Sequence, residues 1–341
     1  MRPMWMIYGA NGYTGELIAR EAVRRGQRPI LAGRNAAAIE PLARELGCEW
    51  RAFDLAKPQL AGVPLVLHCA GPFMHTSKPM VDACLAAGAH YLDITGEIAV
   101  FEAVFRRDAE AKERNVTLLP GVGFDVVPTD CLAAMLHADL PDANELWLAF
   151  SARGAGVSRG TLKTMIEGAG LGGAIRRDGR IKVVPQMYDV REIPFASGPR
   201  LAMTIPWGDV STAYRTTGIP NIRVYSSQPK KALQRMRWMK HVLPALRIAP
   251  LRKVALRLAD RRGGPSEAVR ENARVELWGR VTNARGDERT RTMSVAEGYK
   301  FTVLSSLEAV QGVLAAPRGG AFTPAGFFGA DFVTRIPGTQ L

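Results

Sequence analysis

The run Gly9-Ala10-Asn11-Gly12-Tyr13-Thr14-Gly15 lies near the start of this 341-residue chain. An apolar stretch (4–8) precedes it and an amphipathic stretch (15–25) follows, so it connects a predicted strand to a predicted helix. At such a junction the first glycine permits a tight turn, the second lets the backbone approach a pyrophosphate, and the third lets the helix pack closely on the sheet. The helix N-terminus offers N–H groups to an anion. We therefore expect a dinucleotide-binding turn made by Gly9, Asn11, Gly12, Tyr13, Thr14 and Gly15.

The first 130 residues alternate short apolar runs with helical patterns. This rhythm is typical of βαβ units around a parallel sheet. The predicted strands are 4–8, 29–32, 49–53, 65–70, 90–94 and 116–119. The predicted helices are 15–25, 36–46, 77–87 and 100–114. The expected fold class is α/β, with a Rossmann-type, doubly wound parallel sheet in an N-terminal domain over 1–140.

Beyond residue 140 strand-like stretches come with fewer helices between them, at 145–151, 181–184, 201–205, 222–225, 274–281 and 290–294. They predict a second α+β domain over 141–319, with a mixed or antiparallel sheet that binds substrate and forms a dimer contact. Two helices are expected at 295–315 and 323–334. The C-terminal residues 320–341 are expected to pack back on the first domain.

The end of the second predicted strand bears on the choice of dinucleotide. An NAD enzyme usually places an acid there, to bind the ribose 2′-hydroxyl. This chain has Arg34 and Asn35 instead, and a guanidinium can pair with the 2′-phosphate of NADP. A solvated surface arginine is the alternative. Asp54, after the third strand, either contacts the adenine or caps the following turn.

Further motifs follow the later strands: Ala70-Gly71-Pro72-Phe73, Tyr91-Leu-Asp-Ile-Thr-Gly-Glu97 and Pro120-Gly-Val-Gly-Phe-Asp125. Together with Gly264-Pro-Ser266 and Gly319-Gly-Ala-Phe-Thr-Pro-Ala325, they resemble the saccharopine dehydrogenase-like oxidoreductase family. Within that family the chain is most similar to the short branch that includes trans-acting enoyl reductases of lipid biosynthesis. The resemblance implies a second-domain sheet that faces the nicotinamide cleft, and a homodimer.

The same resemblance implies an NADP(H)-dependent oxidoreductase that reduces a C=C or C=O of a lipid-like or acyl substrate. The family also contains dehydrogenases of amino-acid-derived imines, so that activity is the first alternative. A non-catalytic, NADP-binding regulatory protein is the second.

Ligands of open parallel sheets bind beyond the carboxyl ends of the strands. Residues in the loops at those ends are expected to line the cofactor groove, although the glycines among them could serve only tight turns. These residues are Ala70, Gly71, Pro72, Phe73, Gly96, Gly123 and Phe124.

A reduction usually needs a proton donor besides the hydride. The Tyr-x-x-x-Lys pair of short-chain dehydrogenases is excluded, because no tyrosine has a lysine four places later. The candidate donors are Asp125, Glu97 and His75; the alternatives are loop hydrogen bonding for the two acids and a surface position for the histidine. Ser158, Thr161 and Lys163 either bind substrate or form a helix N-cap. We expect no nucleophilic or metal site.

The net charge of +13 is concentrated in one segment. Residues 230–262 hold eleven Lys or Arg and one acid, Asp260, and so account for ten of the thirteen charges. A nucleic-acid partner is therefore not expected. The segment is a basic amphipathic helix pattern, which either packs on the second domain or a dimer partner, the favoured interpretation, or makes a peripheral contact with an anionic membrane.

The four cysteines have no C-x-x-C spacing and are expected to be reduced thiols. No apolar run reaches the length of about 18 residues that a membrane span needs. The first strand also occupies the place of a cleaved leader. The expected location is the cytoplasm, or the cytoplasm with a peripheral membrane contact.

Overall fold

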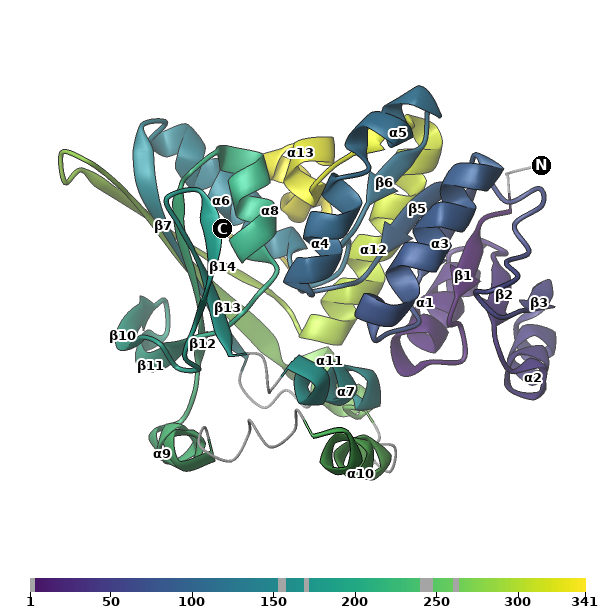
Figure 1. Ribbon diagram of the computed structural model, residues 1–341, viewed down its shortest axis with the longest axis horizontal. Helices are drawn as coiled ribbons and strands as arrows, with labels where there is room; N and C mark the ends of the chain where they lie inside the picture. Colours follow the sequence, from purple (N-terminus) through teal and green to yellow (C-terminus); the bar gives the residue numbers. More distant parts are fainter. Residues whose placement is uncertain (1–3, 153–157, 169–171, 240–247, 260–263) are drawn as a thin grey trace. The chain divides into compact units, whose positions relative to one another are not determined.

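A computed structural model describes residues 4–152, 158–168, 172–239, 248–259 and 264–341 of the chain (Figure 1). The chain divides into two compact units. The first combines Met1–Val127 with Tyr299–Phe328, and the second combines Pro128–Gly298 with Gly329–Leu341. Each unit has its own sheet.

Over the described residues, the first unit is built on a seven-stranded parallel sheet. In spatial order its strands are β15 (Gly320–Ala321), β6 (Thr117–Leu119), β5 (His90–Asp93), β4 (Leu65–His68), β1 (Met6–Tyr8), β2 (Ile30–Gly33) and β3 (Trp50–Ala52). The chain runs outward from β1 to β3, returns to β4 beside β1, and then runs outward in the opposite direction. This is the order of a doubly wound nucleotide-binding sheet, so the predicted Rossmann fold is confirmed.

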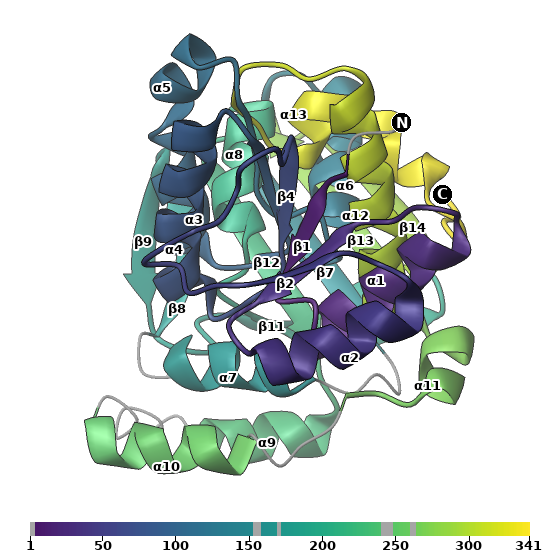
Figure 2. The ribbon, with the colours of Figure 1, turned by 90° about the vertical axis from the view of Figure 1, so that its right-hand side faces the viewer.

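Helices cover both faces of this sheet (Figure 2). One face carries α1 (Tyr13–Arg24), α2 (Ala36–Leu46) and α12 (Gly298–Ala315). The other face carries α3 (Phe73–Ala87) and α4 (Ile98–Phe105). The short helices α5 (Asp108–Glu113) and α13 (Pro324–Phe328) complete the unit. Because the sheet is covered on both sides, its strands are nearly continuous apolar runs rather than alternating ones.

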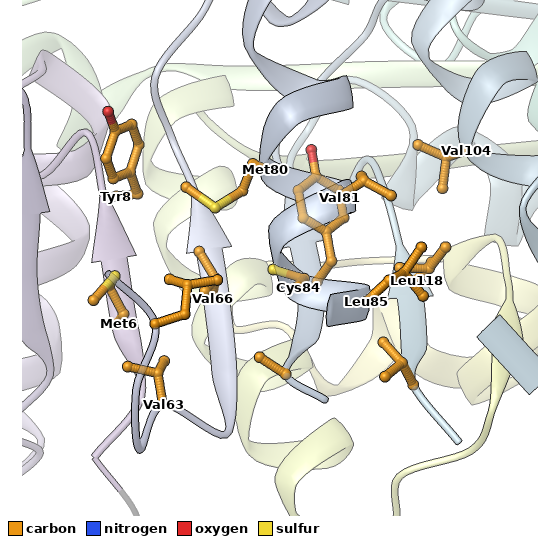
Figure 3. Packing of buried hydrophobic residues seen from close by; sticks show 14 of the residues in the cluster. Met6, Tyr8, Val63, Val66, Met80, Val81, Cys84, Leu85, Val104 and Leu118 are labelled. Atoms are coloured by element: carbon orange, nitrogen blue, oxygen red, sulfur yellow. The ribbon is translucent and has the colours of Figure 1, made fainter. Parts of the chain in front are cut away.

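The core between the sheet and α3 is formed by alternate residues of neighbouring strands (Figure 3). Met6 and Tyr8 of β1 point to the same face as Val66 of β4, since side chains alternate along a strand. Met80 and Cys84, one helical turn apart on α3, pack against them. All five side chains are buried. The sheet is therefore closed by apolar packing along its faces.

The connection from β1 to α1 depends on two glycines that let backbone segments touch. Gly9 has a φ of +89°, and a Cβ atom there would lie 2.7 Å from the backbone nitrogen of Ala70. Gly15 lies in the first turn of α1, where a Cβ atom would lie 2.2 Å from the carbonyl oxygen of Gly9. Such distances are not tolerated between a Cβ and backbone atoms. Glycine at both positions allows α1 to start directly against the end of β1.

The second unit contains a mixed sheet with the order β10-β11-β12-β7-β13-β14, to which β8 and β9 are added beside β12. Its strands are β7 (Ala143–Ala152), β8 (Gly173–Arg177), β9 (Arg180–Val184), β10 (Val190–Phe195), β11 (Gly198–Thr204), β12 (Asn221–Ser227), β13 (Arg274–Asn283) and β14 (Glu288–Ala296). Within the described sheet, β12 and β7 are parallel, and the other pairs are antiparallel. The predicted mixed sheet is confirmed.

The helices of the second unit are short. They are α6 (Val127–Asp139), which starts at the junction, α7 (Arg159–Gly168), α8 (Asp209–Thr217), α9 (Lys230–Met239), α10 (Ala249–Ala259) and α11 (Glu267–Asn272). A 3₁₀ helix (Ala330–Arg335) lies near the C-terminus.

The division into units differs from the predicted ranges 1–140 and 141–319 because the sequence pattern did not reveal α6. This helix packs closely on β13, where a Cβ atom on Gly279 would lie 2.6 Å from the Cδ1 atom of Leu136. Asp130 of α6 also accepts a hydrogen bond of 2.6 Å from Thr216 of α8. The boundary therefore lies at residue 127 rather than 140.

The C-terminal part of the chain is shared between the units. Helix α12 lies within the range predicted for the second domain but belongs to the first unit, where Ser305 donates a 2.7 Å hydrogen bond to the carbonyl of Val122. Of the residues 320–341 expected on the first domain, those up to Phe328 lie in the first unit. The remainder belongs to the second unit, where the backbones of Gln340 and Ser294 exchange hydrogen bonds of 2.8 Å.

Two predicted helices are interrupted. The helix expected over 100–114 is divided into α4 and α5, with no glycine or proline to signal the break. The helix expected over 323–334 is divided into α13 and the 3₁₀ helix by Gly329, which has a φ of +92°. Strands β8 and β10 and helix α8 were not predicted.

All four cysteines are free thiols, as expected. Among the described helices, none has both the length and the apolar character required to cross a bilayer.

The glycine contact at the start of α1 yields a stability prediction. Gly15→Ala should lower the free energy of unfolding by about 1–3 kcal/mol, because the added methyl group must push against a backbone carbonyl that cannot swing away. Gly168→Ala is the matched control, since a Cβ there meets nothing within 4 Å. Urea denaturation of both variants measures the difference. Equal stability of Gly15→Ala and the wild type would contradict the close contact.

Candidate cofactor-binding and active site

The glycine turn leaves the N-terminus of α1 open to an anion. The turn is held by the N–H of Gly9, which donates to the carbonyl of Ala32 (2.7 Å), and by the N–H of Gly12, which donates to the carbonyl of Gly9 (3.0 Å). Gly12 is the N-cap residue of α1 and has no side chain to fill the space in front of the helix. Helical hydrogen bonding begins with the N–H of Glu16. The geometry fits a pyrophosphate, which the N–H groups of a first helical turn attract.

Two further residues of the turn reach neighbouring elements. The Asn11 side-chain oxygen lies 3.1 Å from the position that a Cβ atom on Gly33 would take, so Asn11 contacts the end of β2. Tyr13 packs edge-on against Tyr299 of α12, with 5.1 Å between the ring centroids. The turn is therefore braced from both sides.

Arg34 and Asn35 are exposed directly after β2. The Tyr8 hydroxyl lies near this end of the sheet and donates to the carbonyl of Phe53 (3.1 Å). Burial raises the pKa of Tyr8 to about 12, with a smaller lowering by the charge of Arg34 and a smaller raising by Asp54. Arg34 and Asp54 thus lie at the same end of the sheet, near the same hydroxyl.

Asp54 caps a turn, which is one of the two roles that the sequence left open for it. Its carboxylate accepts the N–H of Ala56 at 2.9 Å. This hydrogen bond accounts for an acidic residue at position 54 without a bound ligand.

The loop after β4 is fixed by a buried histidine that the sequence interpretation missed. Thr76 donates its hydroxyl proton to the carbonyl of Ala70 (2.7 Å), so its oxygen accepts from the Nε2 atom of His68 (3.0 Å). Burial lowers the pKa of His68 to about 3, which keeps the imidazole neutral. The Gly71–Pro72 peptide in this loop is cis. The only sequence signal for His68 is a polar residue at the end of an apolar strand.

Glu97 connects the loop after β5 to the start of α3. Its two carboxylate oxygens accept the N–H groups of Phe73 and Met74, each at 2.8 Å. A carboxylate at a helix N-terminus satisfies orphan donors and is stabilised by the helix dipole. These bonds explain why α3 begins at Phe73, four residues before the predicted start at Ser77. They also support loop hydrogen bonding, the alternative that the sequence left open, as the role of Glu97.

Asp93, at the carboxyl end of β5, is a second residue that the sequence interpretation missed. Its carboxylate accepts the N–H groups of Thr95 (3.0 Å) and Gly121 (2.8 Å) and the hydroxyl of Tyr91 (2.6 Å). Burial raises the pKa of Asp93 to about 6, against the opposing effect of these three donors. Asp93 thereby ties the loop after β5 to the loop after β6.

Asp125 differs from these two carboxylates. Within the described part of the chain, its carboxyl oxygens accept no hydrogen bond, and the side chain is only partly buried. One oxygen would lie 2.8 Å from a Cβ atom on Gly96, so glycine is needed there for the carboxyl to fit. Burial, and then the negative charge of Glu97, raise the pKa of Asp125 to about 7. The group can therefore hold a proton near neutral pH.

Helix α12 positions the loop that carries Asp125. The hydroxyl of Thr302 accepts the N–H of Phe124 (2.9 Å), and the rings of Phe124 and Phe301 meet edge-on. A Cβ atom on Gly123 would lie 2.9 Å from the methyl group of Thr302, so this glycine is required for close packing. The sequence pattern placed α12 in the second domain and therefore did not predict these contacts between α12 and the loop after β6.

The remaining candidate residues lie at the starts of helices α3 and α7. His75 is exposed in the first turn of α3, as its surface interpretation requires. Ser158, Thr161 and Lys163 lie at the start of α7 in the second unit. The hydroxyl of Ser158 accepts the N–H of Thr161 (3.2 Å), which supports the N-cap interpretation.

Known proteins resemble parts of this chain in sequence, and a solved structure resembles it in fold. The chain is 28% identical over 183 residues to a trans-acting enoyl reductase of Mycobacterium tuberculosis, a match that covers 48% of this chain and 43% of that protein. It is 26% identical over 236 residues to a saccharopine dehydrogenase-like oxidoreductase of Bos taurus, covering 59% of this chain and 52% of that protein. The chain thus matches about half the length of these relatives.

Among solved structures, the apo saccharopine dehydrogenase (L-Glu forming) of Saccharomyces cerevisiae has a similar fold. The TM-score between the two structures is 0.63, the sequences are 12% identical, and the match covers 98% of this chain and 96% of that chain. Residues 5–119 match the family model of the saccharopine dehydrogenase NADP binding domain. This range contains the glycine turn, Arg34, the loop after β4 and Glu97. Over these residues the chain resembles the NADP binding domain of saccharopine dehydrogenases.

Proposed function

We propose that the chain is an NADP(H)-dependent oxidoreductase that reduces a C=C or C=O bond of a lipid-like or acyl substrate. The observation that carries the proposal is the glycine turn, which combines two sterically obligatory glycines with an uncapped helix N-terminus. When bound, the nicotinamide of NADPH supplies a hydride. The remaining tasks fall to the side chains and loops of the first unit.

The cofactor is held in three places. The turn at Gly12 would hold the pyrophosphate, and the guanidinium of Arg34, beside Asn35, would hold the 2′-phosphate. The loops beyond β4, β5 and β6 accommodate the ribose and nicotinamide. Their residues are Ala70, Gly71, Pro72, Phe73, Gly96, Gly123 and Phe124.

Asp125 is the proton donor in this proposal. Glu97 and Asp125 form a pair of carboxyl groups in contrasting surroundings, a pattern that separates acid from base. Glu97 accepts two backbone N–H groups, and its negative charge helps to raise the pKa of Asp125. His75, in contrast, is exposed in the first turn of α3.

The substrate class rests on the relatives named as trans-acting enoyl reductases. A direct test supplies NADPH deuterated at C4 together with three kinds of acceptor: a 2-enoyl thioester, a 3-oxoacyl thioester, and a 2-oxo acid mixed with an amine. We expect one deuterium in the product of an acyl acceptor. Transfer only to the imine of the third mixture would replace the proposed substrate with an amino-acid-derived one. Binding of NADPH without any transfer would contradict an enzyme and favour a regulatory protein.

The proposed role of Arg34 predicts a change of cofactor preference. Arg34→Ala should weaken NADPH binding by roughly 10- to 150-fold, the loss of about 1.5–3 kcal/mol for a hydrogen bond to a charged group, and leave NADH binding nearly unchanged. Isothermal titration of both nucleotides measures this. Arg44→Ala is the matched control, because Arg44 is exposed on α2 and pairs with Glu40 (2.6 Å). Equal losses for NADPH and NADH would remove the reason for preferring NADP.

The raised pKa of Asp125 predicts a pH dependence with a definite sign. The folded chain binds a proton at Asp125 up to about pH 7, whereas an unfolded chain releases it near the ordinary value of 3.8. The stability of the wild type relative to Asp125→Asn should therefore fall as the pH rises from about 4 through 7. Denaturation curves at several pH values measure it. Asp331→Asn, at an exposed carboxylate, is the control.

The same substitution should lower the rate of reduction by about 10²- to 10⁴-fold without weakening NADPH binding. The wild-type rate should decline above about pH 7, where the donor has lost its proton. Parallel stability curves for wild type and Asp125→Asn, or an unchanged rate, would contradict the assignment.

A further inference from the structure

The second unit presents a surface that the proposed reductase activity does not use. It consists of α9, Ile248 and α10, the described parts of the basic segment 230–262; residues 240–247 and 260–262 lie outside the described residues. We refer to it as the basic–apolar surface. Both views draw α9 and α10 along the same lower edge of the second unit (Figures 1 and 2).

Large apolar side chains are exposed on this surface. On α10, Leu251, Val254 and Leu258 lie at positions i, i+3 and i+7, and so share one face of the helix. Val254 is 54% exposed and Leu258 is 59% exposed. On α9, Trp238 is 80% exposed. The three side chains on α10 form a continuous apolar stripe, which is uncommon on a protein that contacts only water.

The opposite side of α10 accounts for its packing within the unit. Helix α10 packs on α7, with Ala259 buried and Ala255 and Leu256 partly buried. The exposed stripe therefore does not serve the core of the second unit. The favoured expectation, in which the apolar face packs on the second domain, does not explain these three side chains.

Positive charge surrounds the apolar groups. The described residues 230–239 and 248–259 contain seven cations and no acid. The cations are Lys230, Lys231, Arg235, Arg237, Arg252, Lys253 and Arg257. Lys231 and Arg235 share the helix face of Trp238, at i, i+4 and i+7. Apolar and cationic groups thus alternate over the same surface.

We propose that the basic–apolar surface docks on an anionic phospholipid bilayer. The aliphatic side chains and the indole enter the boundary between headgroups and acyl chains, while the cations are attracted to anionic headgroups. Tryptophan favours this boundary because its ring is both apolar and polar. The chain is thereby a peripheral membrane protein.

Other binding partners would match either the cations or the apolar side chains of the surface, but not both. A second copy of the chain would bring the same seven cations face to face without an acid among them, and like charges oppose such a contact. A nucleic acid would meet the cations but leave the aliphatic stripe in water. An anionic bilayer meets both.

The test is co-sedimentation of the full chain with vesicles of phosphatidylcholine, alone or mixed with phosphatidylglycerol. We expect binding to the mixed vesicles that weakens as salt is added, and little binding to phosphatidylcholine alone. The emission of Trp238 should shift to the blue on binding, measured as the signal that Trp238→Phe removes.

Paired variants separate the two contributions. Val254→Gln/Leu258→Gln and Lys253→Glu/Arg257→Glu should each lower the partition coefficient on mixed vesicles by at least about tenfold. Their controls lie on β9: Val183→Gln, at a side chain 78% exposed, and Arg180→Glu/Lys182→Glu. Unchanged urea denaturation curves show that each variant is folded.

The proposal is overturned if the wild type does not bind vesicles that contain phosphatidylglycerol. It is also overturned if the β9 control variants lose as much binding as the α10 variants. It is also overturned if the wild type forms a dimer that Val254→Gln/Leu258→Gln dissociates, because the stripe is then an interface between copies.

Discussion

The approach of α1 to the end of β1 is the contact on which the first unit depends. Gly15 is pressed against the carbonyl of Gly9, and Gly9 against the backbone at Ala70, so three segments of chain meet where any side chain would separate them. The same approach brings the open N-terminus of α1 to the carboxyl edge of the sheet. One steric constraint thus creates both the fold of the nucleotide-binding half and its anion site.

Around that contact, three buried or partly buried carboxyl groups lie at the edge of the sheet. Asp93 and Glu97 are occupied by backbone donors and join the loops after β4, β5 and β6. Asp125 receives no such donor within the described residues and is left beside a negative charge. Carboxyl groups at the same edge of the sheet thereby acquire different surroundings. Backbone N–H groups bind Asp93 and Glu97, whereas burial and the charge of Glu97 raise the pKa of Asp125 to about 7.

The sequence predicted the parts of this arrangement that rest on local patterns. Alternating apolar runs and the glycine spacing specify the doubly wound sheet and its turn, and Arg34 is recognisable from its place after β2. His68 and Asp93 were missed because their importance comes from partners far along the chain, Thr76 and Gly121. The assignment of α12 failed for the same reason, since Thr302 meets Phe124 only in the folded chain. The apolar stripe on α10 was visible in the sequence, but its exposure was not.

The central claim is that the turn at Gly9–Gly15 binds the pyrophosphate of a nicotinamide dinucleotide. Calorimetric titration of the purified wild-type chain with NADPH tests it most directly. The account predicts saturable binding of one nucleotide per chain, displaced by 2′,5′-ADP. The absence of heat and of displacement with either NADPH or NADH would contradict it.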